Sequence, residues 1–148
     1  MKKILSLIIV IALLAASLTL TVSCSQNDTS GKATIVIGTE EKKVYTVPLS
    51  ELSEGAGLMP AFEYLKANNG LEYDISGTMI NSIGGLKNDY ALGSYIYIYT
   101  SVEADFDVSE WKMEMDYNGK TLVSSGVGFN EMSLTDGAIV YIGLISWG

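Results

Sequence analysis

The sequence predicts an α+β domain that follows an N-terminal signal segment. Residues 58–69 place their apolar side chains at the spacing of a helix, whereas most of the remaining chain resembles short strands separated by glycine turns. Residues 94–100 alternate strictly, and Asn118-Gly119 is a strong signal for a two-residue hairpin. Because strands precede and follow the single helix, we expect the helix to pack on one face of a sheet.

The N-terminal segment, residues 1–23, is expected to be a lipoprotein signal peptide. Two lysines follow the first methionine, and the nineteen residues 4–22 are all apolar, small or hydroxyl-bearing. This order of charge, apolar core and small exit residues is typical of a secretory signal. The ending Thr21 to Cys24 resembles a bacterial lipobox, in which Leu is more usual than Thr21 and the cysteine receives a diacylglyceride. An uncleaved membrane helix is the alternative, because about 20 apolar residues span a bilayer.

Both interpretations place the remaining chain outside the cytoplasmic membrane. We therefore expect the protein to be held at the extracytoplasmic face of the cell membrane by fatty chains, palmitate among them, on Cys24. Residues 24–32 are polar and contain a glycine, which suits a flexible tether. Residues 33–148 have the length of one domain with one core.

The composition argues against several classes of function. The whole chain has a formal charge of −8, and without Lys2 and Lys3 the charge is −10, with no Arg present. Such an acidic surface repels phosphate backbones, so we expect no nucleic-acid partner. There is no His, and Cys24 is the single Cys, so the domain lacks the usual zinc ligands and nucleophile–base pairs. We expect neither a metal site nor enzyme activity.

Two strands and the helix are predicted first along the domain. Residues 33–37 and 43–47 are rich in β-branched residues, and a hairpin connection lies between them. Within 58–69 the apolar residues fall at i, i+3, i+4 and i+7, on one face of a helix. These residues are Leu58, Ala61, Phe62 and Leu65. Pro60 suits the first helical turn, and Gly70 suits the left-handed position after the last turn.

The rest of the domain is predicted to consist of strands. They are expected over residues 71–75, 78–83, 94–100, 111–117, 120–124 and 138–145. Glycine marks the turns between several of them, at Gly84-Gly85, Asn118-Gly119 and Asp136-Gly137.

Two motifs in the middle of the chain suggest a family. The helix ends in a pattern of the form Leu-Lys-x-Asn-x-Gly-Leu-x-Tyr, and a Gly-x-x-Ile-x-Ser-Ile-x-Gly-Leu pattern follows. The matching residues are Leu65, Lys66, Asn68 or Asn69, Gly70, Leu71 and Tyr73, then Gly77, Ile80, Ser82, Ile83, Gly85 and Leu86. Over roughly residues 33–145 the chain resembles the lone β-grasp domain of bacterial lipoproteins related to the C-terminal domain of transcobalamin and intrinsic factor.

This resemblance implies a β-grasp (ubiquitin-like) fold, with a mixed sheet packed on one helix. It also implies corrinoid (cobalamin) binding as one function. In transcobalamin-like proteins a large helical domain closes over the ligand and a histidine can complete the cobalt coordination, and this sequence offers neither. Fold alone does not fix function.

Our leading hypothesis is a membrane-tethered extracellular binding or interaction module for an unknown small molecule or protein. The alternative is a protein that captures cobalamin or another small ligand and supplies it to a membrane transporter.

Tyr95, Tyr97 and Tyr99 are the first candidates for ligand contact. If Ile96 and Ile98 face the core, the three tyrosines form an aromatic stripe on the opposite face. Such a stripe could stack on a flat ligand, a sugar or a peptide. Alternatively, tyrosine simply fits a sheet surface, where cross-strand aromatic pairs contribute about 0.2–1 kcal/mol each.

Trp111 is a further candidate for ligand contact, although its alternation with Met113, Met115 and Tyr117 favours a place in the core. An acidic cluster precedes it, and carboxylate oxygens are the ligands that calcium prefers. Its members are Glu103, Asp105, Asp107 and Glu110. A solvated loop explains the same run of charges.

Overall fold

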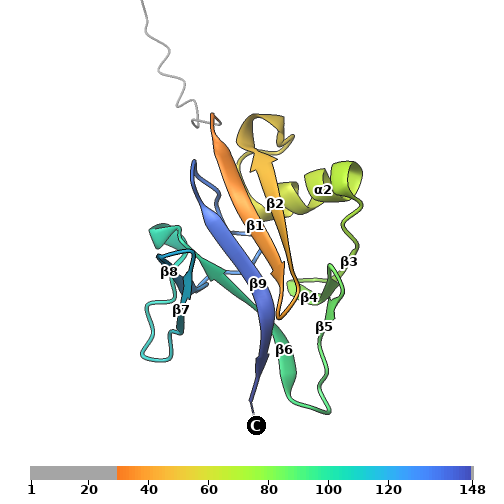
Figure 1. Cartoon of the computed structure of the whole chain (residues 1–148), viewed down its shortest axis with the longest axis vertical. Coiled ribbons are helices and arrows are strands. Elements are labelled where there is room, and N and C mark those ends of the chain that lie inside the picture. The colour runs from red at the N-terminus through yellow and green to blue at the C-terminus, as the bar shows by residue number, and fades with distance from the viewer. Residues whose placement is uncertain (1–29, 148) are drawn as a thin grey trace, which may run out of the picture.

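One α-helix and two β-sheets make up residues 30–147, which are the residues that the computed structural model describes (Figure 1). The predicted signal peptide, Cys24 and most of the predicted tether lie outside the described residues. Among residues 30–147, no helix has the length and apolar character needed to cross a membrane. The α+β class predicted from the sequence is confirmed.

The larger sheet has six strands in the order β2-β1-β9-β6-β8-β7. The strands are β1 (Lys32–Gly38), β2 (Lys42–Pro48), β6 (Ser94–Thr100), β7 (Glu114–Tyr117), β8 (Lys120–Ser124) and β9 (Ile139–Ser146). Only β1 and β9 are parallel, and all other neighbours are antiparallel. The first and last strands of the domain therefore lie side by side at the centre of this sheet.

The smaller sheet has three antiparallel strands in the order β3-β4-β5. They are β3 (Tyr73–Ser76), β4 (Met79–Ile83) and β5 (Leu86–Lys87). Two short 3-10 helices, η1 (Leu49–Glu51) and η2 (Glu103–Asp105), complete the secondary structure of the described residues.

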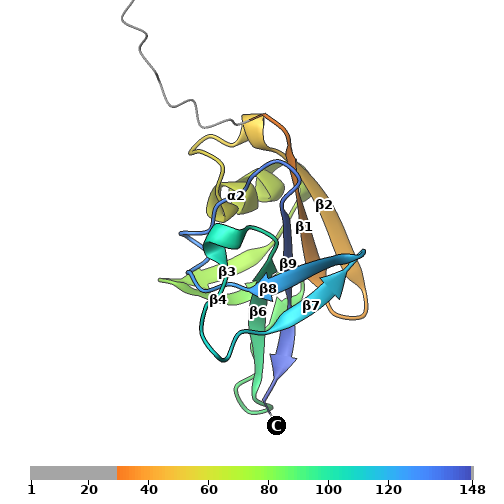
Figure 2. The same cartoon turned by 90° about the vertical axis from the view of Figure 1, so that its left-hand side faces the viewer.

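The helix, α2, spans Leu58–Asn69, as predicted. Its predicted apolar face is buried because Leu58, Ala61, Phe62 and Leu65 all point into the core. Gly70 ends the helix in the left-handed conformation, with φ 66°, and its N–H bonds to the Leu65 carbonyl. The helix packs on one side of the larger sheet, as Figure 2 shows.

The main core lies between α2, the larger sheet and the smaller sheet. Strand β1 has the continuous apolar run expected of a central strand, with Ile35 and Ile37 in the main core and Val36 in a second cluster on the opposite face. All buried members of the main core fall between Ala33 and Ile142. Among residues 30–147 the core is thus contained in the chain that follows the predicted signal peptide, and we expect this part to fold by itself.

The prediction that Trp111 begins a strand and packs in the core is wrong. Trp111 lies in a turn with 78% of its surface exposed, and β7 starts only at Glu114. Side chains hold the turn: the Ser109 N–H bonds to Asp107 Oδ1 at 2.8 Å, and the Trp111 N–H bonds to Ser109 Oγ at 3.2 Å. Such local bonds favour a turn over a strand, and an alternating pattern does not reveal them.

Candidate functional site

The two faces of β6 have different environments, as the alternation predicts. Ile96 and Ile98 pack against the main core. The three tyrosines of β6 are half-buried and lie on the other face. Opposite them on β9, Tyr99 pairs with Tyr141, Tyr97 with Gly143 and Tyr95 with Ile145.

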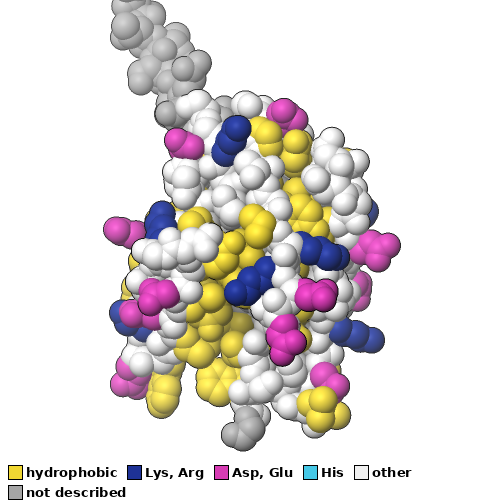
Figure 3. All heavy atoms as spheres, viewed as in Figure 1, with side chains coloured by type: hydrophobic (Ala, Val, Ile, Leu, Met, Phe, Trp, Pro, Cys, Tyr) yellow, Lys and Arg dark blue, Asp and Glu magenta, His cyan; other side chains and the backbone are white. Residues whose placement is uncertain are grey.

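The tyrosines do not form one continuous platform, because they pack against different partners. Tyr97 and Tyr99 meet edge to face, with ring centroids 5.4 Å apart. Tyr141 lies 5.7 Å from Tyr117, and the Lys42 ammonium lies 5.7 Å from the Tyr141 ring centroid. Figure 3 shows apolar side chains gathered along the middle of this face, with charged side chains around them. The rings largely cover one another, as expected for tyrosines that fit a sheet surface.

The same packing affects tyrosine ionisation. Burial, and secondarily the neighbouring Tyr97, raises the pKa of Tyr99. Burial, and secondarily Tyr117, raises the pKa of Tyr141. Both phenols are therefore neutral at physiological pH. The shallow depression beside them, about 290 Å³, has Gly143 in its lining, where a Cβ would lie 3.0 Å from a ring carbon of Tyr141.

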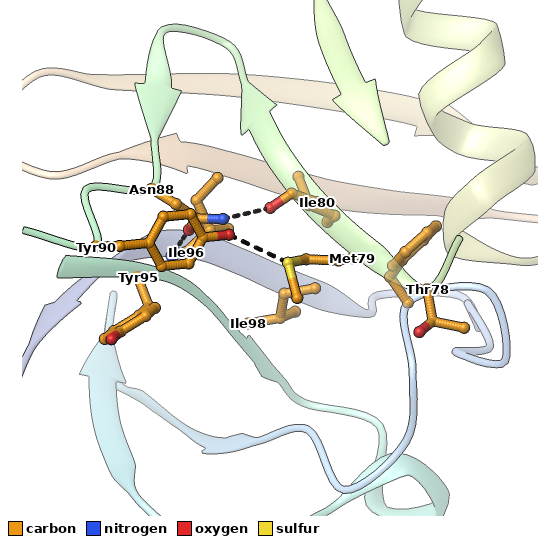
Figure 4. A pocket seen from close by; sticks show the side chains of 9 residues that line it. Thr78, Met79, Ile80, Asn88, Tyr90, Tyr95, Ile96 and Ile98 are labelled. Carbon is orange, nitrogen blue, oxygen red and sulfur yellow. Dashed lines mark hydrogen bonds between the residues drawn. The ribbon is translucent and has the colours of Figure 1, made fainter. Parts of the chain in front are cut away.

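A different groove lies between β6 and the smaller sheet. It measures about 300 Å³ and is lined mainly by apolar and aromatic side chains (Figure 4). The lining residues are Thr78, Met79, Ile80, Asn88, Tyr90, Tyr95, Ile96, Ile98 and Phe129. Phe129 connects the groove to the core, because its ring stacks on that of Phe62 with centroids 6.3 Å apart. This is an open site of a size that holds a small ligand or one or two side chains.

The rim of this groove is aromatic and exposed. Tyr90 is 61% exposed, and its ring lies 5.8 Å from that of Tyr95 in an edge-to-face arrangement. The Tyr90 hydroxyl donates to Met79 Sδ at 3.2 Å, and the Met79 side chain is itself 52% exposed. Tyr90 thus reaches across the groove from the loop before β6 to the first residue of β4.

Asn88 connects the two sides of the groove. Its amide nitrogen donates to the Ile80 carbonyl at 2.9 Å, and its amide oxygen accepts from the Ile96 N–H at 2.7 Å (Figure 4). The side-chain amide therefore occupies the place of a peptide group between β4 and β6. A charge-neutral residue with both a donor and an acceptor is needed for this double contact.

Of the candidates named from the sequence, only Tyr95 lines the groove. Tyr97 and Tyr99 lie on the tyrosine face, and Trp111 lies in the separate turn before β7. Met79, Asn88 and Tyr90 could not be chosen from local patterns, because the groove is formed by β4, the β5–β6 loop and β6, which meet only in the folded domain. A loop of Asn, Asp and Tyr directly before an alternating strand was the available signal.

The acidic segment does not gather around a common point. Asp105 is buried and accepts the Ser133 N–H at 2.9 Å, which ties η2 to the loop before β9. Asp107 accepts the Ser109 N–H, and this bond lowers the pKa of the carboxyl group. Within residues 30–147, no group of three Asp, Glu, His or Cys side chains is placed to hold a metal ion.

Comparisons with known proteins give a likeness of fold, but no family. No protein-family model matches the chain, and no curated protein matches it. Among solved structures, the domain is similar to a protein from Ruminococcus gnavus ATCC 29149 described as a "putative metal binding protein". The TM-score is 0.51 at 10% sequence identity, and the match covers 80% of this chain and 100% of the other. At that identity, the likeness concerns the fold alone.

Proposed function

We propose that this protein is an extracytoplasmic binding module, tethered to the cell membrane through lipid on Cys24, that takes an apolar or aromatic ligand in the groove between β4 and β6. The observation that supports this most is the groove itself: about 300 Å³, apolar at its base and open to solvent past Tyr90 and Met79. Exposed aromatic side chains around an apolar depression are typical of binding sites.

The position of the groove fits a tethered module. Residue 30 enters at one end of the domain, whereas the start of β6 and the β5–β6 loop lie toward the other end (Figure 1). A ligand would therefore approach from the side away from the anchor. The acidic surface and the lack of His and Arg agree with a role in binding and not in phosphate or acyl-transfer chemistry.

We propose further that the fold is a β-grasp. The supporting features are an N-terminal hairpin (β1 and β2), a helix after it and a final strand, β9, placed parallel to β1 at the centre of the sheet. The order β2-β1-β9-β6 is the strand order of such a fold.

Corrinoid capture follows only from the family resemblance. A groove of this volume lies at the lower end of the range for small-ligand sites, so it could hold part of a corrinoid but not enclose it. Equilibrium dialysis of the soluble domain, residues 25–148, against cyanocobalamin tests this directly. Retained red colour at micromolar ligand supports corrinoid capture, and an equal concentration on both sides of the membrane excludes it.

The groove is tested with N-phenyl-1-naphthylamine, a neutral apolar probe whose fluorescence rises in apolar sites. Met79→Lys places a charge at the rim, and Val44→Lys is the matched control because Val44 is similarly exposed, at 56% against 52% for Met79, but lies on β2. We expect Met79→Lys to weaken probe binding at least tenfold and Val44→Lys to leave it unchanged. Equal effects of the two variants, or no probe binding by the unaltered domain, would contradict the proposal.

A further inference from the structure

Strand β2 forms a free edge of the larger sheet. Within the described chain it pairs only with β1, because it stands at the end of the order β2-β1-β9-β6-β8-β7 (Figure 1). The edge is open to solvent, since Lys42, Val44 and Thr46 are all exposed, Val44 to 56%. An open strand edge of this kind is a template for pairing with another chain.

The hydrogen bonds of β1 show which backbone groups of β2 point outward. The Thr34 N–H bonds to the Ala138 carbonyl at 2.8 Å, so the even-numbered residues of β1 direct their backbone groups toward β9. The odd-numbered residues of β1 therefore bond to β2, and the register sets them opposite odd-numbered residues of β2. The Leu49 N–H continues this pattern by bonding to the Gly31 carbonyl at 3.0 Å. The even-numbered residues of β2 thus direct their backbone groups away from the sheet.

Three residues offer both an N–H and a C=O group along this edge. They are Lys42, Val44 and Thr46, and in the described part of the chain no hydrogen bond reaches their outward backbone groups. Pro48 is the next outward residue, and it ends the row because it has no N–H. A second strand laid along the row would bond to three N–H and three C=O groups.

A second copy of the chain can occupy this edge as an antiparallel strand, related to the first by a two-fold axis. The outward residues must then pair with each other, which limits where the axis can lie. An axis at Lys42 or Lys43 sets lysine opposite lysine, which is destabilising. An axis at Tyr45 or Thr46 brings Pro48 into the ladder, where it has no N–H to donate. Lysine and proline usually discourage strand addition, and here they exclude these four arrangements.

An axis at Val44 uses the whole row. Val44 then pairs with Val44 of the second copy, and Lys42 pairs with Thr46 in both directions, so six hydrogen bonds join the two chains. Each lysine of β2 lies opposite Thr46 or Tyr45, so no lysine faces another lysine. The two exposed Val44 side chains meet on the tyrosine face of the sheet, because Val44 lies opposite Val36 of that face. Contact between them removes apolar surface from water.

We infer that two copies of this protein pair through β2 and join their larger sheets into one continuous sheet. Lys32 lies opposite Pro48, four residues from the axis, so the two chains enter the pair about 30 Å apart. The predicted tether, residues 24–32, spans up to about 30 Å, which lets both copies be anchored in one membrane. A shared membrane also raises their local concentration. Strands β1 and β9 separate this edge from β6, so the pairing is independent of the groove.

Cysteine cross-linking of the full chain in isolated membranes tests the register. Cys24 is the single cysteine and is expected to carry lipid, so one introduced thiol per chain is available for oxidation. Val44→Cys places two thiols opposite each other at the axis, with Cα atoms about 5.5 Å apart, within the range of a disulfide. Thr46→Cys is the matched control, because the two copies of residue 46 lie about 14 Å apart.

Oxidation should give a disulfide-linked dimer with Val44→Cys but not with Thr46→Cys alone. A mixture of Lys42→Cys chains and Thr46→Cys chains should also give the dimer, because residues 42 and 46 lie opposite each other. No dimer with Val44→Cys, or equal cross-linking of Val44→Cys and Thr46→Cys, would overturn the inference.

Sedimentation equilibrium of the soluble domain gives the second measurement. At millimolar concentration the unaltered domain should show an average mass above that of one copy. Val44→Lys should weaken association at least about tenfold, because it sets two lysines opposite each other at the axis. A single-copy mass for the unaltered domain would overturn the inference, whether the edge meets another protein or water. Retained binding of N-phenyl-1-naphthylamine by both domains would show that they are folded and would leave the proposed groove function standing.

Discussion

Replacement of Asn88 by alanine tests the construction of the groove most sharply. The Asn88 side chain joins the Ile80 carbonyl on β4 to the Ile96 N–H on β6, through bonds of 2.9 and 2.7 Å. Alanine removes both bonds and leaves two half-buried backbone groups without these partners. A typical hydrogen bond contributes about 0.5–1.5 kcal/mol net, so we expect Asn88→Ala to lower the free energy of unfolding by about 1–3 kcal/mol.

The matched control is Asn81→Ala. Asn81 lies on β4, and its side-chain nitrogen donates to Asp74 at 3.1 Å, but this bond is exposed to solvent. We expect its loss to change the free energy of unfolding by less than about 0.5 kcal/mol. Urea unfolding of the soluble domain, followed by far-ultraviolet circular dichroism, measures the free energy of unfolding of both variants. The comparison requires that this free energy fall with urea concentration at the same slope in each variant. If Asn88→Ala is no more destabilising than Asn81→Ala, the Asn88 side chain does not hold the two sheets together.

Three further predictions concern the helix, the exposed tryptophan and tyrosine ionisation. Gly70→Ala should destabilise the domain by about 1 kcal/mol in urea unfolding, because φ is 66° at this position; no loss would refute the left-handed helix end. Trp111→Ala should change the free energy of unfolding by less than about 0.5 kcal/mol, because the side chain is exposed. Phe62→Ala, at a fully buried aromatic residue, should lower the free energy of unfolding by about 3–5 kcal/mol. Equal losses in the two variants would contradict the exposure of Trp111. Burial, and then the hydrogen bond to Glu63, raises the pKa of Tyr73 to about 12. The stabilising contribution of this phenol should be present below pH 10 and lost between pH 10 and 12, where the unfolded chain ionises first. In Tyr73→Phe, urea unfolding between pH 10 and 12 should lack the part of the stability loss that ionisation of Tyr73 causes. If this variant shows the same pH profile as the unaltered domain, the raised pKa is contradicted.

Local features of the sequence predicted the helix and the faces of β6 correctly. Helical spacing, Pro60 and Gly70 all lie within one segment, so they fix both ends of α2 without reference to the rest of the chain. The alternation of Ile96 and Ile98 with the tyrosines likewise depends only on the strand period of two. Such short-range patterns determine which side of an element faces the core.

Features that depend on distant segments could not be predicted in the same way. The parallel pairing of β1 with β9 joins residues about a hundred positions apart, and periodicity carries no information about partners. The groove required β4, the loop around Asn88 and β6 to meet. Trp111 fits the alternation of its neighbours, but side-chain bonds from Asp107 and Ser109 favour a turn there.

Ligand binding between β4 and β6 can be located by NMR chemical-shift mapping of the ¹⁵N-labelled soluble domain with N-phenyl-1-naphthylamine. We expect the largest changes at the amides of Met79, Ile80, Ile96 and Ile98, around the groove. Changes centred instead on Tyr99, Tyr141 and Gly143 would place binding on the tyrosine face and contradict ligand binding in the groove.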